Sequence, residues 1–191
     1  RRERVLTHAG APDQALAMSY WPTTDDDDAQ EEATLELLAR ILRLEMTDTI
    51  REQLGASYSP TSGSSMSNIY DGYGTFSTSV IVEPSQASEV FGVVDQLAEK
   101  LRTAPVDEDT LARARKPLLE QIAQAKKSNG YWLGVADDAQ LEADRLDRIR
   151  TQEARYNAVT PQMLQQAAQE YLDPAHALRI RIVHESLADS Q

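Results

Sequence analysis

The stretch DAQEEATLELLARILRLEMTDTIREQLG, residues 28–55, decides the fold of this chain. Its apolar residues recur at a spacing of three and four, which predicts an amphipathic helix. The apolar stripe comprises Leu35, Leu37, Leu38, Ile41, Leu42, Leu44, Met46 and Thr49. A stripe of this width is typical of a helix that lies on a sheet. Asp28 and Glu31 predict an N-cap with a capping-box partner, and Gly55 is placed to end the helix.

Four segments around this helix have the composition of β-strands. They are Ala15–Trp21, 57–65, 72–82 and Leu178–Val183. Pro22 is expected to end the first strand, and a turn around residue 68 joins the second strand to the third. Strands joined by so short a turn pair antiparallel. In the last strand aliphatic residues alternate with Arg179 and Arg181, which predicts that one face lies in water.

Helical patterns fill the chain between the third and fourth strands. They are expected at 84–101, 105–129, 131–143, 145–155 and 161–171. Pro117 is expected to kink or break the second of these helices, and Asn129-Gly130 to end it. The order of elements predicts an α+β domain with a mostly antiparallel four-stranded sheet and helices packed on one face. Residues 1–185 are expected to form this single domain, and residues 186–191 a frayed tail.

The composition argues against several classes of protein. The net charge is −12 and no basic stripe is visible, so no nucleic-acid partner is expected. No apolar run approaches the roughly 18 residues that a membrane span needs. The absence of cysteine excludes disulfides and thiolate metal sites. Arg1–Arg4 lead straight into a domain-like pattern without a signal peptide, as expected of an excised fragment.

The sequence lacks a complete catalytic centre. Zinc hydrolases use histidines and carboxylates at fixed spacings, but His8, His176 and His184 form neither H-E-x-x-H nor its inverse H-x-x-E-H. Each histidine is expected at a loop or a strand edge. Neither a cysteine nor a G-x-S-x-G elbow supplies a nucleophile. The run Asp25–Asp28 lacks the spacing and the glycine of a calcium loop and indicates a solvated helix entry.

The segment Ile50–Pro60 holds the strongest functional candidates. Arg51 occupies the last turn of the predicted helix and Tyr58 the entry of the next strand, and a chain break at Gly55 allows both to swing toward one point. Each residue also has an ordinary explanation, because arginine favours a helix C-terminus and tyrosine favours strands. The residues alone leave a functional pair and a structural pair both open.

This segment resembles a signature of the pitrilysin/insulinase-type zinc metallopeptidases, the inverzincins. Members carry an arginine near a helix end, a leucine–glycine pair, and a tyrosine seven positions after the arginine. Four stretches carry the resemblance, in the order found in the family, and together they span nearly the whole chain. They are His8-Ala9-Gly10 before an apolar strand, Arg51 with Leu54, Gly55 and Tyr58, Lys127 to Leu133, and Val159-Thr160-Pro161 before a helix.

The resemblance implies a mitochondrial-processing-peptidase-like domain from the C-terminal, zinc-free part of a bacterial enzyme. In such enzymes the N-terminal half holds zinc through H-x-x-E-H, and the C-terminal half closes a chamber around a peptide. Arg51 and Tyr58 carry over as substrate-binding residues, and Tyr58 also as a catalytic residue that stabilises the transition state. The implied partners are the N-terminal zinc-binding half of the same protein and a peptide substrate. Zinc belongs to the parent enzyme, and no cofactor is expected in this chain.

Three interpretations of function follow. The leading one is a substrate-binding and chamber-closing domain of a bacterial zinc-dependent endopeptidase, inactive by itself. The alternative is a non-catalytic scaffold or interaction domain of the same superfamily. A stand-alone domain that binds a small molecule would need a closed pocket, which the sequence does not reveal. Bacterial relatives of this type suggest a periplasmic location. Trp132 is expected to be structural and to anchor a helical hairpin.

Overall fold

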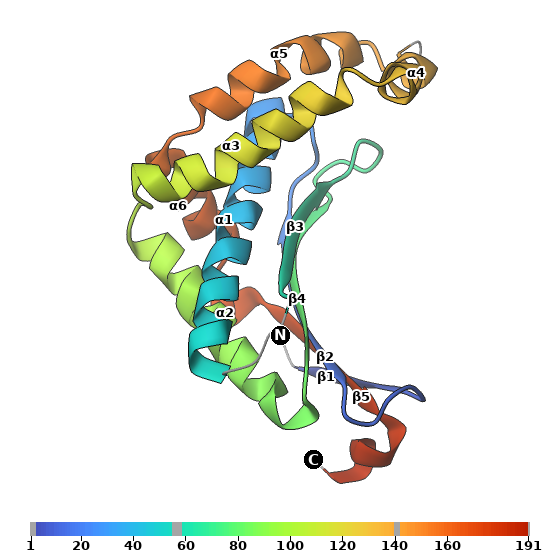
Figure 1. Ribbon diagram of the computed structural model, residues 1–191, viewed down its shortest axis with the longest axis vertical. Helices are drawn as coiled ribbons and strands as arrows, with labels where there is room; N and C mark the ends of the chain where they lie inside the picture. The colour runs from blue at the N-terminus through green and yellow to red at the C-terminus, as the bar shows by residue number, and fades with distance from the viewer. Residues whose placement is uncertain (1–2, 55–58, 140–141, 191) are drawn as a thin grey trace.

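The computed structural model describes residues 3–54, 59–139 and 142–190 of the chain (Figure 1). The strands are β1 (Arg4–His8), β2 (Ala15–Thr23), β3 (Thr61–Met66), β4 (Gly74–Val82) and β5 (Leu178–His184). The α-helices are α1 (Ala29–Leu54), α2 (Ala87–Thr103), α3 (Glu108–Ala125), α4 (Asn129–Asp138), α5 (Arg145–Ala158) and α6 (Pro161–Tyr171). Short 3-10 helices are η1 (Pro84–Gln86), η2 (Pro174–His176) and η3 (Glu185–Ser190). Every strand and helix expected from the sequence is present, and β1 is additional.

The sheet has five strands in the order β1-β5-β2-β4-β3, which corrects the expectation of a four-stranded, mostly antiparallel sheet. β2 pairs antiparallel with β4 and β5, and β3 pairs antiparallel with β4, but β1 pairs parallel with β5. The sequence pattern did not predict β1, because the five residues of this strand pair with β5 at the far end of the chain. Local periodicity carries no information about such a pairing.

Pro22 lies inside β2 and does not end it. β5 pairs with β2 only as far as Tyr20, which lies opposite Leu178. Beyond Tyr20, β2 therefore has a single neighbour, β4, where Pro22 lies opposite Thr75. A proline is tolerated in a strand where one side makes no ladder hydrogen bonds. The end of β5 thus explains why the strand continues through the proline.

β5 turns its arginines toward the helix layer, which is the reverse of the expected orientation. Arg179 and Arg181 lie opposite buried residues of β2. The Nη2 atom of Arg179 is 2.5 Å from Oδ2 of Asp95 in α2, and Nε of Arg181 is 2.9 Å from Oε1 of Glu3. Leu178, Ile180 and Ile182 therefore lie on the other face of the sheet. Alternation in the sequence shows that two faces differ but not which one meets the helices.

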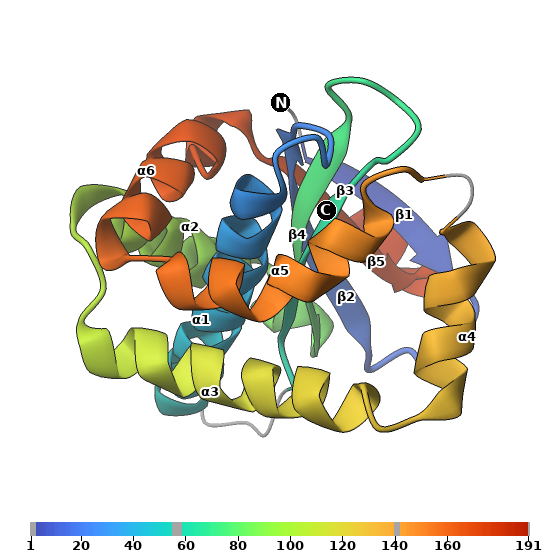
Figure 2. The same ribbon diagram turned by 90° about the horizontal axis from the view of Figure 1, so that it is seen from above.

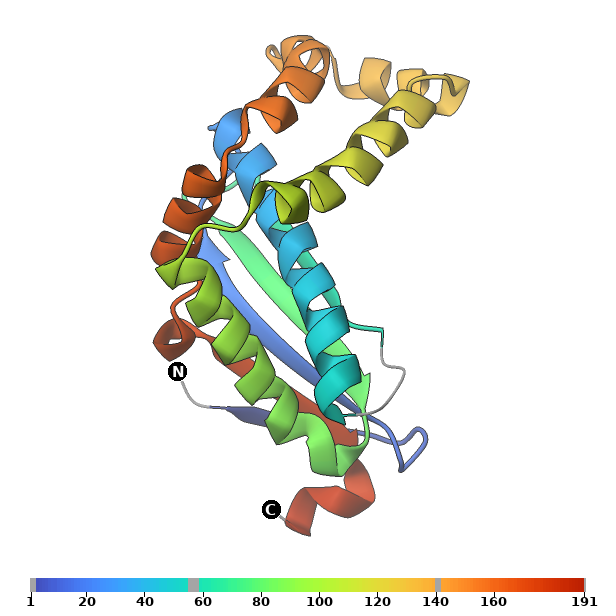
Figure 3. The ribbon, with the colours of Figure 1, turned by 60° about the vertical axis from the view of Figure 1, so that its left-hand side comes forward.

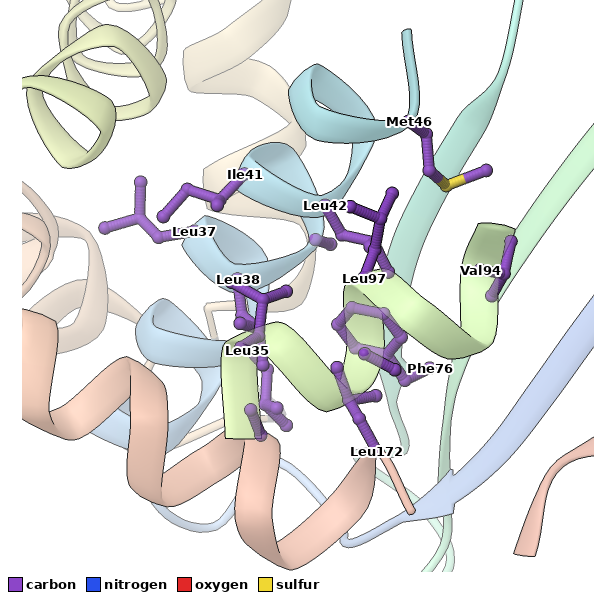
Figure 4. Packing of buried hydrophobic residues seen from close by; sticks show 14 of the residues in the cluster. Leu35, Leu37, Leu38, Ile41, Leu42, Met46, Phe76, Val94, Leu97 and Leu172 are labelled. Carbon is purple, nitrogen blue, oxygen red and sulfur yellow. The ribbon is translucent and has the colours of Figure 1, made fainter. Parts of the chain in front are cut away.

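The helices α1, α2 and α6 cover one face of the sheet (Figures 1 and 3). α3 and α5 pack against the outer side of α1, and α4 extends away from the helix layer (Figure 2). Leu37 and Ile41 of α1 point away from Leu42, which lies on the side of Leu97 and Phe76 (Figure 4). The apolar stripe of α1 is wide because helices cover α1 on the side opposite the sheet as well.

The N-terminus of α1 follows the sequence prediction in part. Oδ1 of Asp28 accepts hydrogen bonds from the backbone N–H groups of Gln30 at 2.8 Å and Glu31 at 3.2 Å, as an N-cap residue does. Oε1 of Glu31 accepts from the hydroxyl of Tyr171 in α6 at 2.5 Å, in place of the expected return bond of a capping box. The glutamate therefore ties α6 to α1.

Two local expectations are corrected. α3 runs through Pro117 without a break and ends at Ala125. Asn129-Gly130 opens α4 and does not end α3, because Oγ of Ser128 caps α4 by accepting from the N–H of Tyr131 at 3.3 Å. Residues Glu185–Ser190 form η3, which contacts β1 and β5.

Leu42 is fully buried at the centre of the core. We expect Leu42→Ala to lower the free energy of unfolding by about 2–5 kcal/mol, because the truncation removes buried apolar surface and leaves a cavity. Chemical denaturation monitored by circular dichroism measures this loss. Leu133→Ala, at an exposed position of α4, is the control and is expected to change stability by no more than about 0.5 kcal/mol. Equal effects of the two changes would contradict the proposed core.

Candidate functional site

Arg51 lies in the last turn of α1 with its side chain exposed. The carboxylates that would hold a structural arginine are Asp48 and Glu52. Oδ2 of Asp48 lies 3.9 Å from Nη2 of Arg113 instead. Within the described ranges, Arg51 makes no hydrogen bond or ion pair, and Glu52 makes no ion pair. The guanidinium of Arg51 is thus open to a group from outside these ranges.

Tyr58 and Gly55 lie outside the described residues, so the approach of Tyr58 to Arg51 stays a prediction. β3 begins at Thr61 and lies alongside α1. The two elements run side by side in opposite directions (Figure 1).

A cleft of about 610 Å³ opens at the other end of α1. It lies between the entry to α1, the β3–β4 connection, α4 and α5. Its charged lining consists of Asp26, Glu32, Asp137, Glu142, Arg145, Arg148 and Arg155. Because an α-helix rises 1.5 Å per residue, Glu32 lies roughly 28 Å along α1 from Arg51. The cleft and the Arg51 segment are therefore separate places.

Arg148 of α5 is the centre of the cleft. Its Nε lies 2.5 Å from Oδ2 of Asp144, and its Nη1 lies 3.3 Å from Oε2 of Glu32 and 3.7 Å from Oδ2 of Asp26. Its Nη2 also donates to the backbone carbonyl oxygens of Asp26 and Asp27. One guanidinium thus joins α5 to α1 and to the loop that precedes α1. Sequence reasoning missed this joint because Asp26 and Glu32 lie more than a hundred residues before Arg148 and form no motif with it.

Burial raises the pKa of Glu32 above its ordinary value, although the nearby Arg148 lowers it. Burial likewise raises the pKa of Asp26. By contrast, the hydrogen bond from Arg148 lowers the pKa of Asp144, which is exposed. For Glu32 and Asp26 the loss of solvation outweighs the attraction of Arg148. The ionised forms of these two carboxylates are therefore destabilised by the loss of solvation in the folded chain.

We expect the Glu32→Gln variant to become more stable relative to the unsubstituted 191-residue chain as the pH rises. A carboxyl with a raised folded-state pKa contributes stability that is present below its unfolded value, about 4.5, and is lost as the pH rises through the folded value. Glutamine does not ionise, so the variant does not lose this stability. Its unfolding free energy should therefore rise relative to that of the unsubstituted chain between about pH 4.5 and pH 7. Urea denaturation at several pH values measures the difference, with Glu120→Gln on α3 as control. A difference that moves against the variant as the pH rises would show that the Arg148 pair outweighs burial.

Trp132 anchors the junction of α3 and α4, but it is not a core residue. Its indole N–H donates to the carbonyl oxygen of Lys126 at 2.7 Å, just past the end of α3. The side chain is 47% exposed, because α4 stands away from the core. Val159-Thr160-Pro161 has a similar structural role, since Oγ1 of Thr160 caps α6 by accepting from the N–H of Met163 at 3.2 Å.

The three histidines lie at strand ends or in a short turn, as expected. His8 ends β1, His184 ends β5 and His176 ends η2. Nδ1 of His8 accepts from the N–H of Gly10 at 2.9 Å, and its Nε2 lies 3.0 Å from the carbonyl oxygen of Gln14. Among the described residues, no group of three or more histidines, cysteines or carboxylates is placed to hold a metal ion. In the same part of the chain no helix is long and apolar enough to cross a membrane.

A family model described as the peptidase M16 inactive domain matches residues 2–118, which run from β1 to Leu118 in α3. The chain belongs to this family. The resemblance read from Arg51, Leu54, Gly55 and Tyr58 is confirmed at the level of the family. The description of an inactive domain agrees with a sequence that has no H-x-x-E-H motif.

The proteins similar to this chain include two that are much longer and one of about its own length. The chloroplastic stromal processing peptidase of Oryza sativa subsp. indica is 27% identical over 115 residues, which are 60% of this chain and 9% of that protein. A putative zinc protease from Bordetella pertussis Tohama I has a TM-score of 0.73 at 18% identity, over 90% of this chain and 94% of that one. The periplasmic protease PqqL from Escherichia coli has a TM-score of 0.72 at 16% identity, over 95% of this chain and 20% of that one. At these identities the solved structures show the shared fold.

Proposed function

We propose that this chain is the C-terminal, substrate-binding and chamber-closing domain of a bacterial zinc-dependent endopeptidase. The parent hydrolyses peptide bonds at a zinc site on its N-terminal half. This chain supplies a wall of the chamber and two residues that reach the bound peptide, Arg51 and Tyr58. Membership of the M16 inactive-domain family supports the assignment to a peptidase. The chain spans only a small part of the stromal peptidase and of PqqL, so the activity of the whole belongs to a longer polypeptide.

The observation that carries the proposal is the aliphatic face of the sheet opposite α1, α2 and α6. The register of the strands places these side chains on one face: Leu6, Leu16, Met18, Ile81, Leu178, Ile180 and Ile182. Ile81 is 58% exposed, and no described α-helix lies against this face in Figure 1. An uncovered apolar sheet face of this kind favours burial against another structural layer. We assign that layer to the rest of the parent chain, which includes the zinc-binding half.

The two proposed site residues suit different parts of the chemistry. An arginine offers a planar fork of N–H donors that can hold a peptide carbonyl. A tyrosine hydroxyl can donate a hydrogen bond to the oxyanion that develops as water attacks the scissile carbonyl. The exposure of Arg51 and its lack of partners among the described residues support this role. We place the parent in the periplasm, where PqqL acts.

We expect the 191-residue chain alone to bind no stoichiometric zinc and to cleave no peptide. The reason is that its sequence has no H-x-x-E-H motif to supply zinc ligands and a general base. Metal analysis of chelator-washed protein and a quenched-peptide assay measure both properties. One tightly held zinc ion per chain, or peptidase activity that a chelator abolishes, would overturn this assignment.

In the intact parent, we expect Tyr58→Phe to lower kcat about 10²–10³-fold, the scale seen when one oxyanion donor is lost. KM should change little, because the hydrogen bond strengthens mainly in the transition state. Steady-state kinetics on a quenched peptide measures both constants, and thermal unfolding measures stability in parallel. If kcat stays within about twofold while the melting temperature falls, Tyr58 is structural, and the scaffold function gains support.

Arg51→Lys tests the second residue of the pair. Lysine keeps the charge but loses the planar fork, so both substrate affinity and rate should fall while the melting temperature stays the same. Arg113→Lys, at an exposed arginine of α3 that lies 3.9 Å from Asp48, is the matched control and should leave the kinetics unchanged. Equal kinetic effects of the two changes would mean that Arg51 has no special place at the site.

A further inference from the structure

The hairpin tip, residues 67–73 between β3 and β4, holds large apolar side chains in solvent. Ile69 is 75% exposed, Tyr70 is 67% exposed and Tyr73 is 59% exposed. The tip projects beyond the end of the sheet (Figures 1 and 2). Aromatic and aliphatic side chains gathered in this way on a soluble domain are typical of a docking surface.

The backbone of the hairpin tip is held by its own hydrogen bonds. Oγ of Ser67 accepts from the N–H groups of Ile69 at 3.0 Å and Tyr70 at 2.8 Å. The N–H of Ser67 donates to the carbonyl oxygen of Tyr73 at 2.9 Å. The N–H of Tyr73 donates to the carbonyl oxygen of Tyr70 at 3.2 Å. The rings of Tyr70 and Tyr73 pack edge to face with centroids 6.3 Å apart. A surface fixed in advance loses less conformational entropy when a partner binds.

An acidic loop lies directly against the hairpin tip. Oδ2 of Asp25 accepts from the N–H of Gly72, and the N–H of Asp26 donates to the carbonyl oxygen of Ser67 at 3.1 Å. The hydrogen bond from Gly72 lowers the pKa of Asp25, so this carboxylate is charged at neutral pH.

Most of the negative charge at the tip has no compensating cation. Within the part of the chain that the structure describes, four carboxylates of this region form no ion pair: Asp25, Asp27, Asp28 and Asp71. The cation beside them, Arg148, is already bound to Asp26, Glu32 and Asp144. The tip therefore combines exposed aromatic rings with unpaired negative charge.

We propose that the hairpin tip and the loop Asp25–Asp28 together form a docking surface for a cationic peptide, an extended segment with lysine or arginine next to an apolar side chain. Arginine and lysine stack on aromatic faces such as those of Tyr70 and Tyr73. Their charges pair with the carboxylates of the loop, and an apolar neighbour packs on Ile69. The inference rests on the proposed function in taking a peptide as the occupant, and it deepens that function by naming a basic class of substrate.

The charge of the chain disfavours other occupants of the tip. A second copy carries the same net charge of −12 and is repelled. Nucleic acids and anionic lipid surfaces are repelled for the same reason. A neutral apolar partner would leave the exposed carboxylates of Asp27 and Asp71 unpaired. The combination of rings and carboxylates is matched by a basic peptide.

The test is a titration of the ¹⁵N-labelled 191-residue chain followed by nuclear magnetic resonance. The probe is a short peptide in which arginine alternates with leucine, and the comparison peptide has glutamate in place of every arginine. We expect the cationic peptide to shift the amide signals of residues 67–73 and of the Asp25–Asp28 loop, and the anionic peptide to shift none of them. The affinity should fall as salt is added, because the contacts lie at the surface.

Two double variants separate the contributions of rings and charge. Tyr70→Ser with Tyr73→Ser removes both rings, and the dissociation constant should rise roughly two- to fivefold for each ring. Asp27→Asn with Asp71→Asn removes two charges and should raise it roughly two- to fivefold for each charge. Ile81→Thr and Asp13→Asn are matched controls at the other end of β4 and in the β1–β2 connection, and should leave the affinity unchanged.

Equal binding of the anionic peptide would overturn the proposal, as would an unchanged affinity in either double variant. Signal changes at the exposed aliphatic face of the sheet instead of the tip would also overturn it. This outcome is distinguishable from failure of the proposed function. The tip lies at the N-terminal end of α1 and Arg51 lies at its C-terminal end. The kinetics of Tyr58→Phe in the intact parent therefore test the proposed function without involving the tip.

Discussion

The burial of α1 on two sides is the constraint on which the rest of the structure depends. A helix with so wide an apolar stripe leaves hydrophobic surface in water if it only lies on a sheet. In this chain Leu42 and Met46 face the sheet and α2, while Leu37 and Ile41 face the other way. α3 and α5 exist in their observed places because that outer side must be covered. The α4 segment, which covers little of the core, is correspondingly exposed.

The local parts of the fold were predictable because their causes are local. The start of α1 follows from the cap at Asp28, and its extent follows from the spacing of its apolar residues. The parallel pair of β1 and β5 was not predictable, because each strand finds its partner across the whole chain. The orientation of the two faces of β5 is the reverse of the prediction, again because the partner lies elsewhere in the chain. Arg179 turns inward because Asp95 of α2 receives it, and that carboxylate is invisible to the alternation of the strand itself.

The candidate functional residues likewise fall into those that a local sequence signature reveals and those that only the fold brings together. Arg51 and Tyr58 were found because a short segment resembles a family signature, and the match of residues 2–118 to the M16 inactive domain supports that source. The Arg148 joint gave no signal, since Asp26, Glu32 and Asp144 acquire meaning only when α5 lies beside the entry to α1. At the hairpin tip the sequence predicts only a turn, because it shows that aromatic residues are present but not that they stay in solvent. Exposure is a property of the assembled fold.

A domain without a complete catalytic centre of its own can still contribute to a reaction by holding surfaces at fixed positions. Under the proposed function α1 serves this purpose, since it is a continuous helix of 26 residues with the acidic loop and hairpin tip at its start and Arg51 in its last turn. The core fixes both ends, so a peptide that bound at the tip and reached Arg51 would be held over a set length. Holding a substrate at two places lowers the entropic cost of orienting it for attack. α1 is about 39 Å long at 1.5 Å per residue. On the two proposals together, it separates the peptide-binding tip from Arg51 by most of this length, so affinity can be adjusted at one end without disturbing the geometry at the other.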